Sequence, residues 1–306
     1  MARGYRWSRE KLSDEYGRQV EAIAPLIISA SRAMDIPSCH SDWFMERLRR
    51  GYVEWRNPFN GKTDYISFSK VRAIVFWTKD ASPLLQHLQE LDEMGISYYF
   101  QYTVNDYEGL GYEPRMPPLK QRARTFKELS ERIGKERVLW RFDPLLLSEE
   151  LDADSLLQRV AKVGEMLHHH TDTLTISFID IQRYRRLRRK LEKRGIREPS
   201  EDEIIELAQG ISALNERWEL RLQACAEEVD LKRFGIEKAA CVEGERLKRI
   251  APHDTVLHQF IASWGCKDPG QRKECGCLLS KDIGGYGTCG NGCVYCYANH
   301  AAQASM

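Results

Sequence analysis

The sequence predicts an α/β protein: a TIM-like (β/α) barrel, closed or partial, with a cysteine-rich C-terminal extension over the barrel mouth. Three observations favour this fold. Short β-rich runs alternate with helix-like segments through the first three quarters of the chain, as in a parallel sheet. No run is followed by the G-x-G-x-x-G turn of a dinucleotide-binding sheet. Polar residues follow the β-rich runs, and the ends of the strands are where a parallel barrel carries its active site. An open, doubly wound sheet is the alternative.

The predicted strands are rich in β-branched and aromatic residues and lie at 26–29, 73–78, 96–103, 138–142, 173–178, 220–224 and 236–241. Helical spacing of apolar residues predicts helices between them. The clearest begins at Ser82, has Pro83 in its first turn, and stops at Gly95. Two more run through 156–167 and 204–214. Strand, helix and strand in repetition indicate parallel pairing.

The composition describes an ordinary globular protein. The chain has 306 residues, of which 42% are hydrophobic and 30% charged, so it can bury a sizeable core. A net charge of +1 gives no overall attraction for acidic partners. The charged N-terminus lacks the apolar region of a secretory signal, and no later run is long enough for a membrane span. We therefore expect a cytoplasmic protein without membrane contact.

We expect two parts, a barrel domain at residues 1–250 and an iron–sulfur-binding extension at residues 251–306. After about residue 250 the apolar periodicity gives way to Gly, Cys and Tyr. Few large apolar residues are available there to form a core, so a bound metal is expected to order the segment.

A substrate site is predicted where polar residues follow the strands. The expected catalytic residues are Arg32, Asp35, Lys79, Arg141 and Asp143. In a parallel barrel such positions converge at the mouth. The cations suit a carboxylate or phosphate, and the carboxylates suit an amine or hydroxyl. We therefore expect a small-molecule or nucleotide-type substrate. Each residue taken alone is better explained as a helix cap or a loop hydrogen-bonder, and it is their joint placement that predicts a site.

Nine cysteines occur, and all but Cys39 and Cys225 lie at or after Cys241. An odd number without an export signal favours metal ligation over disulfides. Cys289, Cys293 and Cys296 form C-x-x-x-C-x-x-C. Thiolates at this spacing can hold three irons of a four-iron cluster and leave the fourth iron open. Structural zinc is the alternative, although zinc prefers four protein ligands.

The triplet, with Tyr295 before its last cysteine, resembles the signature of the radical S-adenosylmethionine superfamily. The string CVYCYA is most similar to members of the spore photoproduct lyase type. This resemblance implies a 4Fe-4S cluster whose open iron binds S-adenosylmethionine, Tyr295 packing against the adenine, and an electron donor such as ferredoxin or flavodoxin. SRAMDIP, RFDP and the C-terminal cysteine block together resemble the uncharacterised family called domain of unknown function 1848. That family supplies no substrate.

A second metal site is predicted from the remaining C-terminal thiols. Four of the five cysteines Cys225, Cys241, Cys266, Cys275 and Cys277 are expected to hold an auxiliary iron–sulfur cluster or zinc. Cys39 is interpreted as a reduced, buried cysteine.

Two functions remain open. The first is an iron–sulfur enzyme, radical or otherwise redox-active, acting on a polar substrate in the barrel mouth. The second is a metal-stabilised nucleic-acid-binding protein without catalysis, using the basic run from Arg183 to Arg194. Nearby acids, such as Glu198 and Glu201, make a solvated helix the simpler interpretation of that run.

Overall fold

The computed structural model describes residues 7–58, 60–265 and 267–299, and a parallel eight-stranded sheet is their centre. Its order is β11-β10-β9-β8-β7-β6-β3-β12, and every neighbouring pair is parallel. The strands are β3 (Ile27–Ala30), β6 (Ala73–Thr78), β7 (Ser97–Thr103), β8 (Val138–Leu145), β9 (Thr173–Phe178), β10 (Arg221–Ala224), β11 (Glu237–Lys238) and β12 (Lys281–Asp282). Each predicted strand has a counterpart in the sheet, although the one predicted at 236–241 is only the two-residue β11, and β12 is an addition from the C-terminal segment.

The sheet keeps two edges, so the predicted closed barrel is not confirmed. The edge strands β11 and β12 have two residues each, too short for a ladder between them. The chain before β12 instead bonds to the chain after β11. Gly276 N–H donates to Ala239 O at 3.2 Å, and Leu278 N–H donates to Val242 O at 2.9 Å. In a closed barrel, a ladder of hydrogen bonds would join β11 to β12. Irregular backbone around Cys275 and Cys277 lies in its place.

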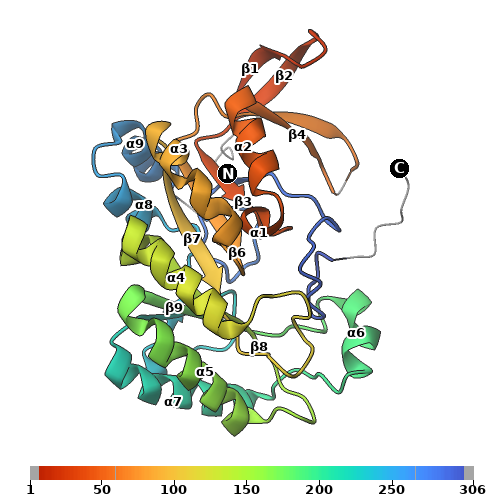
Figure 1. Ribbon diagram of the computed structural model, residues 1–306, viewed down its shortest axis with the longest axis vertical. Coiled ribbons are helices and arrows are strands. Elements are labelled where there is room, and N and C mark those ends of the chain that lie inside the picture. The colour runs from red at the N-terminus through yellow and green to blue at the C-terminus, as the bar shows by residue number, and fades with distance from the viewer. Residues whose placement is uncertain (1–6, 59, 266, 300–306) are drawn as a thin grey trace.

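The helices are α1 (Ile36–Cys39), α2 (Ser41–Arg50), α3 (Leu88–Glu93), α4 (Leu119–Ile133), α5 (Ala153–Leu167), α6 (Arg185–Glu192), α7 (Glu201–Trp218), α8 (Gly244–Ile250) and α9 (Thr255–Trp264). Helices α3, α4, α5 and α7 lie along one flank of the sheet, and α6 lies apart from them (Figure 1). The three predicted helices are confirmed, and the one with Pro83 starts as a 3-10 turn (Ser82–His87) before α3. None of the helices in the described residues could cross a membrane.

Alternate residues of each strand enter different cores, as the pleat requires. Tyr98 and Phe100 of β7 pack with the helices that follow β6, β7 and β8. Tyr99 points to the other face and packs with Leu247 of α8 and Leu257 of α9. Farther along that inner face Gln101 is fully buried and polar. The inner face is therefore closed by apolar packing around Tyr99 and carries hydrogen-bonding groups from Gln101 onward.

A smaller sheet at the N-terminus was not predicted. Its order is β1-β2-β5-β4, from β1 (Ser8–Ser13), β2 (Gln19–Ala24), β5 (Thr63–Ser67) and β4 (Tyr52–Arg56). β1 pairs antiparallel with β2, and β2 pairs parallel with β5. Most side chains of the run SREKLS are exposed, so the run is polar and cannot be recognised as a strand from the sequence. Pairing with β2, the next strand in the chain, supplies what local propensity lacks.

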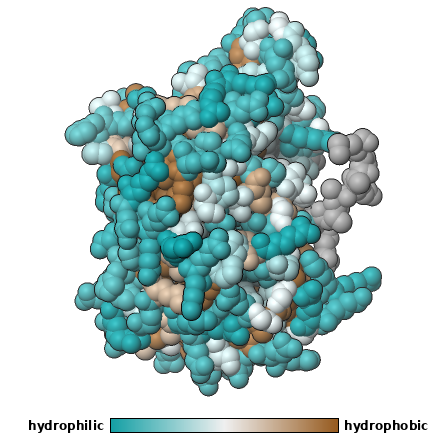
Figure 2. All heavy atoms as spheres, in the orientation of Figure 1, coloured by the Kyte–Doolittle hydropathy of each residue, from teal (hydrophilic) through white to brown (hydrophobic). Residues whose placement is uncertain are grey.

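The outer helices pack closely on each other, while the face seen in Figure 2 is predominantly hydrophilic. At the α5–α7 contact, Gly164 lies under the indole of Trp218. A Cβ on Gly164 would lie 2.1 Å from the Trp218 ring, which no rotamer adjustment of an alanine can relieve. The absence of a side chain at residue 164 thus sets how closely α5 approaches the end of α7.

Gly164→Ala is therefore expected to destabilise the protein by about 1–3 kcal/mol, as overpacking does in other cores. The measurement is chemical denaturation followed by circular dichroism. Gln158→Ala on the exposed side of the same helix is the control and should have little effect, because alanine is the better helix former. An unchanged midpoint in Gly164→Ala would contradict the close packing.

Candidate functional site

The C-terminal loop that carries the cysteine triplet lies against the carboxyl ends of β3, β6 and β7. We call residues 284–298 the cysteine loop. Trp55 Nε1 donates to Gly284 O at 3.1 Å, and a ring nitrogen of His40 donates to Thr288 O at 3.0 Å. On the other side, Val294 N–H donates to Tyr112 O at 3.0 Å. The loop is thus held between the segments that follow β3 and β7.

Asp35 joins three of these segments. One carboxylate oxygen caps α1 by accepting from Ser38 N–H at 3.0 Å, as an aspartate before a helix commonly does. The other accepts from Lys79 N–H at 2.7 Å and from Asn291 Nδ2 at 3.0 Å. Burial raises the pKa of Asp35 to about 7. Asp35 therefore fixes the cysteine loop to the ends of β3 and β6.

Glu113 is a second hub, and it has no counterpart among the predicted site residues. Its buried carboxylate accepts from Lys79 Nζ at 2.9 Å, from Arg122 Nη1 at 3.3 Å, and from the Tyr295 hydroxyl. Asn105 Nδ2 also donates to it, at 3.0 Å. Burial opposes ionisation of Glu113, but the Lys79 and Arg122 charges leave its pKa below the usual range.

Tyr295 is consequently an interior residue. Lys79 Nζ lies 5.4 Å from the centre of its ring, and Tyr107 packs against it edge-on at 6.1 Å. Its hydroxyl bonds to Glu113 and accepts from Asn105 Nδ2 at 3.2 Å. The structure therefore gives Tyr295 a role in anchoring the cysteine loop, and the predicted adenine contact stays a prediction.

The three thiols of the triplet lie near one another, and a fourth thiol lies beside them. The charges of Cys289 and Cys296 both act on Cys293, whose pKa is raised to about 12, chiefly by burial. The positive charge of Lys79 acts in the other direction and lowers that pKa. Cys39, at the end of α1, hydrogen-bonds to Cys289 and donates to Asn291 Oδ1 at 3.3 Å. Cys39 is half-buried and thus belongs to this site, not to the hydrophobic core.

At the end of β8, the buried Arg141 forms an ion pair with Asp143, whose side chain is partly exposed. Arg141 Nη2 lies 2.5 Å from Asp143 Oδ2, and Ser177 donates to the other carboxylate oxygen. Burial opposes ionisation of Asp143, but Arg141 keeps its pKa below the usual value. Arg141 also donates to Gln101 Oε1 at 3.1 Å. Its contacts are with the protein's own side chains, so much of its binding capacity is occupied.

Arg32 has freer contacts. Its guanidinium lies 3.9 Å from Asp282 Oδ2 and reaches Ser280 Oγ only at 3.4 and 3.5 Å. It stacks on Trp77 with its Cζ 5.2 Å from the ring centre, and Arg141 stacks on the same ring at 5.3 Å. Trp77 is itself fixed by donation to Ser29 Oγ at 3.0 Å. Trp77 is two positions before Lys79 in the sequence. No sequence pattern predicts that Arg32 and Arg141 both stack on the Trp77 ring.

A second group of thiols meets at the edges of the sheet. Cys225 follows β10, Cys241 follows β11, and Cys275 and Cys277 belong to the segment before β12. Cys225 Sγ and Cys241 Sγ are 3.5 Å apart, and Arg141 Nη1 donates to Cys241 Sγ at 3.0 Å. The structure thus brings together four of the five cysteines predicted for the second site. Cys266 lies outside the described residues.

Thiolates are the ligands that iron and zinc both accept, so the chemistry of the two cysteine groups suits a metal. As they stand, however, the described residues contain no group of three or more His, Cys, Asp or Glu side chains arranged to hold an ion.

The basic run is found on α6, whose Arg188 and Lys190 side chains point to solvent. Arg188 forms an ion pair with Glu192 at 2.7 Å, and Arg197 beyond the run pairs with Glu203 at 2.6 Å. Tyr184, just before the helix, stacks on Tyr297 of the cysteine loop with ring centres 4.7 Å apart. The contact between α6 and the cysteine loop is thus made by this tyrosine pair.

Comparison with known proteins gives a family and no activity. No curated protein matches the chain. A solved structure from Bacteroides thetaiotaomicron, described as a "putative alpha-L-fucosidase", matches at 9% identity over 61% of this chain and 74% of that chain, with a TM-score of 0.26. A score this low supports no conclusion about fold or activity. The family described as "Domain of unknown function (DUF1848)" matches residues 27–298. Because this match covers most of the sequence and includes the cysteine triplet, the chain belongs to the DUF1848 family.

Proposed function

We propose that this protein is an iron–sulfur enzyme whose Cys289, Cys293 and Cys296 hold a 4Fe-4S cluster with one iron open to a ligand. In this proposal the main sheet is a partial (β/α) barrel, and the substrate binds at its mouth. The protein would act in the cytoplasm with an electron donor of the ferredoxin or flavodoxin kind. When bound, the cluster supplies electron transfer and an iron that can ligate S-adenosylmethionine or a substrate.

One observation carries the proposal: a single loop holds three thiols against the strand ends where charged side chains gather. Asp35 and Lys79 contact each other through the Lys79 backbone and reach the loop through Asn291 and Tyr295. Lys79 also lies close enough to act on the charge of Cys293. Ligand chemistry at an iron needs contact distances, and this arrangement supplies polar groups beside the thiols.

The chain's own residues would bind and orient the substrate. Arg32 is the best candidate for an anionic group, since its ion pair with Asp282 is long, at 3.9 Å, and its stacking on Trp77 fixes its plane. Arg141 and Asp143 are saturated by mutual contacts and would position other groups. Asp35, with its raised pKa, can carry a proton near neutral pH while it remains a hydrogen-bond partner of Asn291.

The alternative proposal, a metal-stabilised nucleic-acid-binding protein, has less support. Its candidate surface is α6, where the exposed basic side chains include Arg188, which already has an acidic partner. The distinguishing observation is the metal itself. Anaerobically purified protein that contains stoichiometric zinc and no iron after reconstitution would reject the iron–sulfur proposal and favour the alternative.

We expect anaerobically reconstituted protein to be brown and to contain about four irons per chain at this site. Cys293→Ala should remove that iron, because two thiolates cannot retain the cluster. Cys39→Ala is the matched control, since Cys39 hydrogen-bonds to Cys289 but is not needed by a three-cysteine cluster. Loss of the cluster in Cys39→Ala would mean that all four irons have protein ligands, which would contradict the open iron.

The use of S-adenosylmethionine is tested on the same preparation. After reduction with dithionite, addition of S-adenosylmethionine is expected to change the electron-spin-resonance signal and to release 5′-deoxyadenosine. An unchanged signal would remove S-adenosylmethionine from the proposal and leave direct ligation of a substrate. Arg32→Met should then weaken binding of an anionic substrate without altering iron content, because Arg32 is not a ligand.

A further inference from the structure

The second group of thiols forms a connected set. Cys225 Sγ and Cys241 Sγ are 3.5 Å apart. Cys277 lies against the residue that follows Cys241, since Val242 N–H donates to Cys277 Sγ at 3.3 Å, and Cys277 N–H donates to Cys275 Sγ at 3.4 Å. Four sulfurs from three separate segments are thus linked in one chain of contacts. Thiols separated by up to 52 positions in the sequence meet only because the fold brings them together.

The spacing favours a single ion over a cubane. Four sulfurs at about 2.3 Å from a tetrahedral zinc lie about 3.8 Å from one another. The Cys225–Cys241 separation of 3.5 Å is close to this value. In a cubane each thiolate binds a different iron, so the sulfurs stand farther apart. The sulfurs would have to separate to bind a cluster, whereas an ion needs only side-chain rotation about it.

Hydrogen-bond donors surround the sulfurs. Four thiolates around a divalent ion leave an excess of negative charge, which a buried site must offset. Arg141 Nη1 donates to Cys241 Sγ at 3.0 Å, and the positive charge of Arg32 acts on Cys277. Backbone amides donate to the sulfurs as well: Val242 N–H to Cys277 Sγ at 3.3 Å, and Cys277 N–H to Cys275 Sγ at 3.4 Å. Such donors around the ligand atoms orient and tune metal sites.

We propose that Cys225, Cys241, Cys275 and Cys277 bind one tetrahedral metal ion of the zinc class, separately from the cluster proposed at Cys289, Cys293 and Cys296. The ion would replace the hydrogen bonds between the thiols. It would join the ends of β10 and β11 to the segment that leads into β12, across the interval where the sheet has no ladder. Its role is structural, because four protein ligands leave no open position.

The test uses the full-length chain with Cys289, Cys293 and Cys296 all changed to Ala, purified anaerobically. This variant separates the two metal proposals, since it cannot hold the first cluster. It should retain about one zinc per chain, and cobalt exchanged for the zinc should give the intense visible spectrum of tetrahedral thiolate coordination. A further Cys275→Ala and Cys277→Ala change should abolish both signals and lower the melting temperature.

Several results would overturn the proposal. One is a variant that lacks the triplet but takes up several irons with a cluster spectrum. Another is protein that binds neither zinc nor cobalt while its circular dichroism remains native. A third is loss of the zinc in Cys266→Ala, which would replace the assigned ligand set. Because the cobalt spectrum is read on folded protein with all four thiols intact, the proposal can be rejected even if the Cys275 and Cys277 variants fail to fold.

Discussion

Glu113→Ala is expected to destabilise the protein by about 3–5 kcal/mol, the usual cost of removing one partner from a buried ion pair. The Glu113 carboxylate is buried and neutralises two cations, Lys79 at 2.9 Å and Arg122 at 3.3 Å. Arg122 is only 1% exposed, so it cannot exchange Glu113 for water. The same change frees the hydroxyl of Tyr295 and loosens the cysteine loop. Reconstituted iron should therefore be held less tightly.

Urea denaturation and iron content after a chelator challenge measure the two effects of the Glu113 change. Glu113→Gln keeps an acceptor for Tyr295 but removes the charge, so it should retain iron better than Glu113→Ala while still losing stability. Glu21→Gln is the control for a carboxylate in an exposed pair, with Arg9 at 2.5 Å, and should cost no more than about 1 kcal/mol. Equal midpoints for Glu113→Ala and Glu21→Gln would contradict the assigned role.

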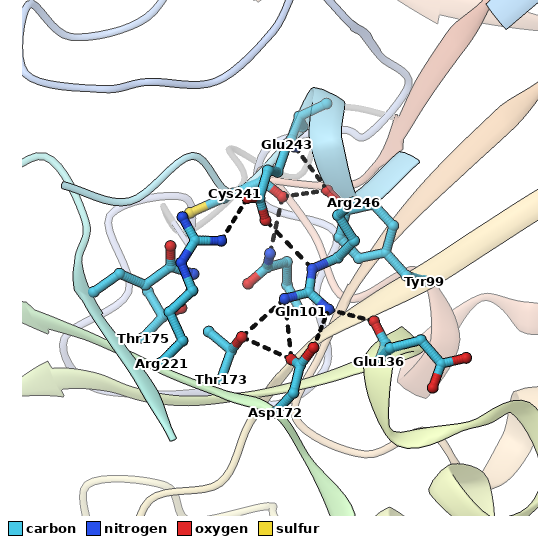
Figure 3. A network of polar contacts seen from close by, with 12 residues as sticks. Tyr99, Gln101, Glu136, Asp172, Thr173, Thr175, Arg221, Cys241, Glu243 and Arg246 are labelled. Atoms are coloured by element: carbon cyan, nitrogen blue, oxygen red, sulfur yellow. Dashed lines mark hydrogen bonds and ion pairs between the residues drawn. The ribbon is translucent and has the colours of Figure 1, made fainter. Parts of the chain in front are cut away.

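Arg246→Met is expected to cost a similar amount, about 3–5 kcal/mol, at the opposite end of the sheet. Arg246 of α8 is fully buried, and its guanidinium bonds to both carboxylate oxygens of Asp172, at 3.0 and 3.1 Å (Figure 3). It also donates to Thr173 Oγ1 at 2.8 Å and lies 3.4 Å from Glu243 Oε2. Methionine fills much of the space but leaves the two carboxylates without this cation.

The control for Arg246→Met lies on the same helix. Lys248→Met removes a cation whose partner, Glu245, is largely exposed, so water can replace the lost contact and the stability should hardly change. Denaturation curves of both variants under the same conditions make the comparison. The iron content of folded Arg246→Met should equal that of the wild type, because the hydrogen-bond partners of Arg246 do not include a cysteine of the triplet. Equal curves for the two variants would contradict the buried network.

Part of the site was visible in the sequence because its signals are local. The spacing of Cys289, Cys293 and Cys296 puts three thiols on one loop whatever the fold. Asp35 and Lys79 could be proposed because each follows a recognisable strand, and carboxyl ends of parallel strands share one edge. Glu113 could not be proposed. It lies in a long segment between β7 and α4 that has neither apolar periodicity nor a metal-ligand spacing.

Cys39 shows how the same residue type can be misjudged. A lone cysteine in a helix-forming segment most often packs as a small hydrophobic residue. Cys39 is a free thiol, but it is half-buried and not part of the hydrophobic core. The structure places Cys39 beside Cys289 because α1 ends where the cysteine loop crosses it. Two positions 250 residues apart in the chain give no signal of such a contact when only one sequence is read.

The sequence by itself determined the strands of the main sheet other than β12, three of the helices, the cysteine triplet and the family. These features depend on neighbours within a few residues, through alternating burial, helical spacing and ligand spacing. Only the tertiary structure decided that the sheet keeps two edges, that Cys225 and Cys241 meet Cys275 and Cys277, and that Glu113 anchors Tyr295. Those contacts depend on how distant segments pair and pack, and the burial they create gives each charged partner a large effect on stability.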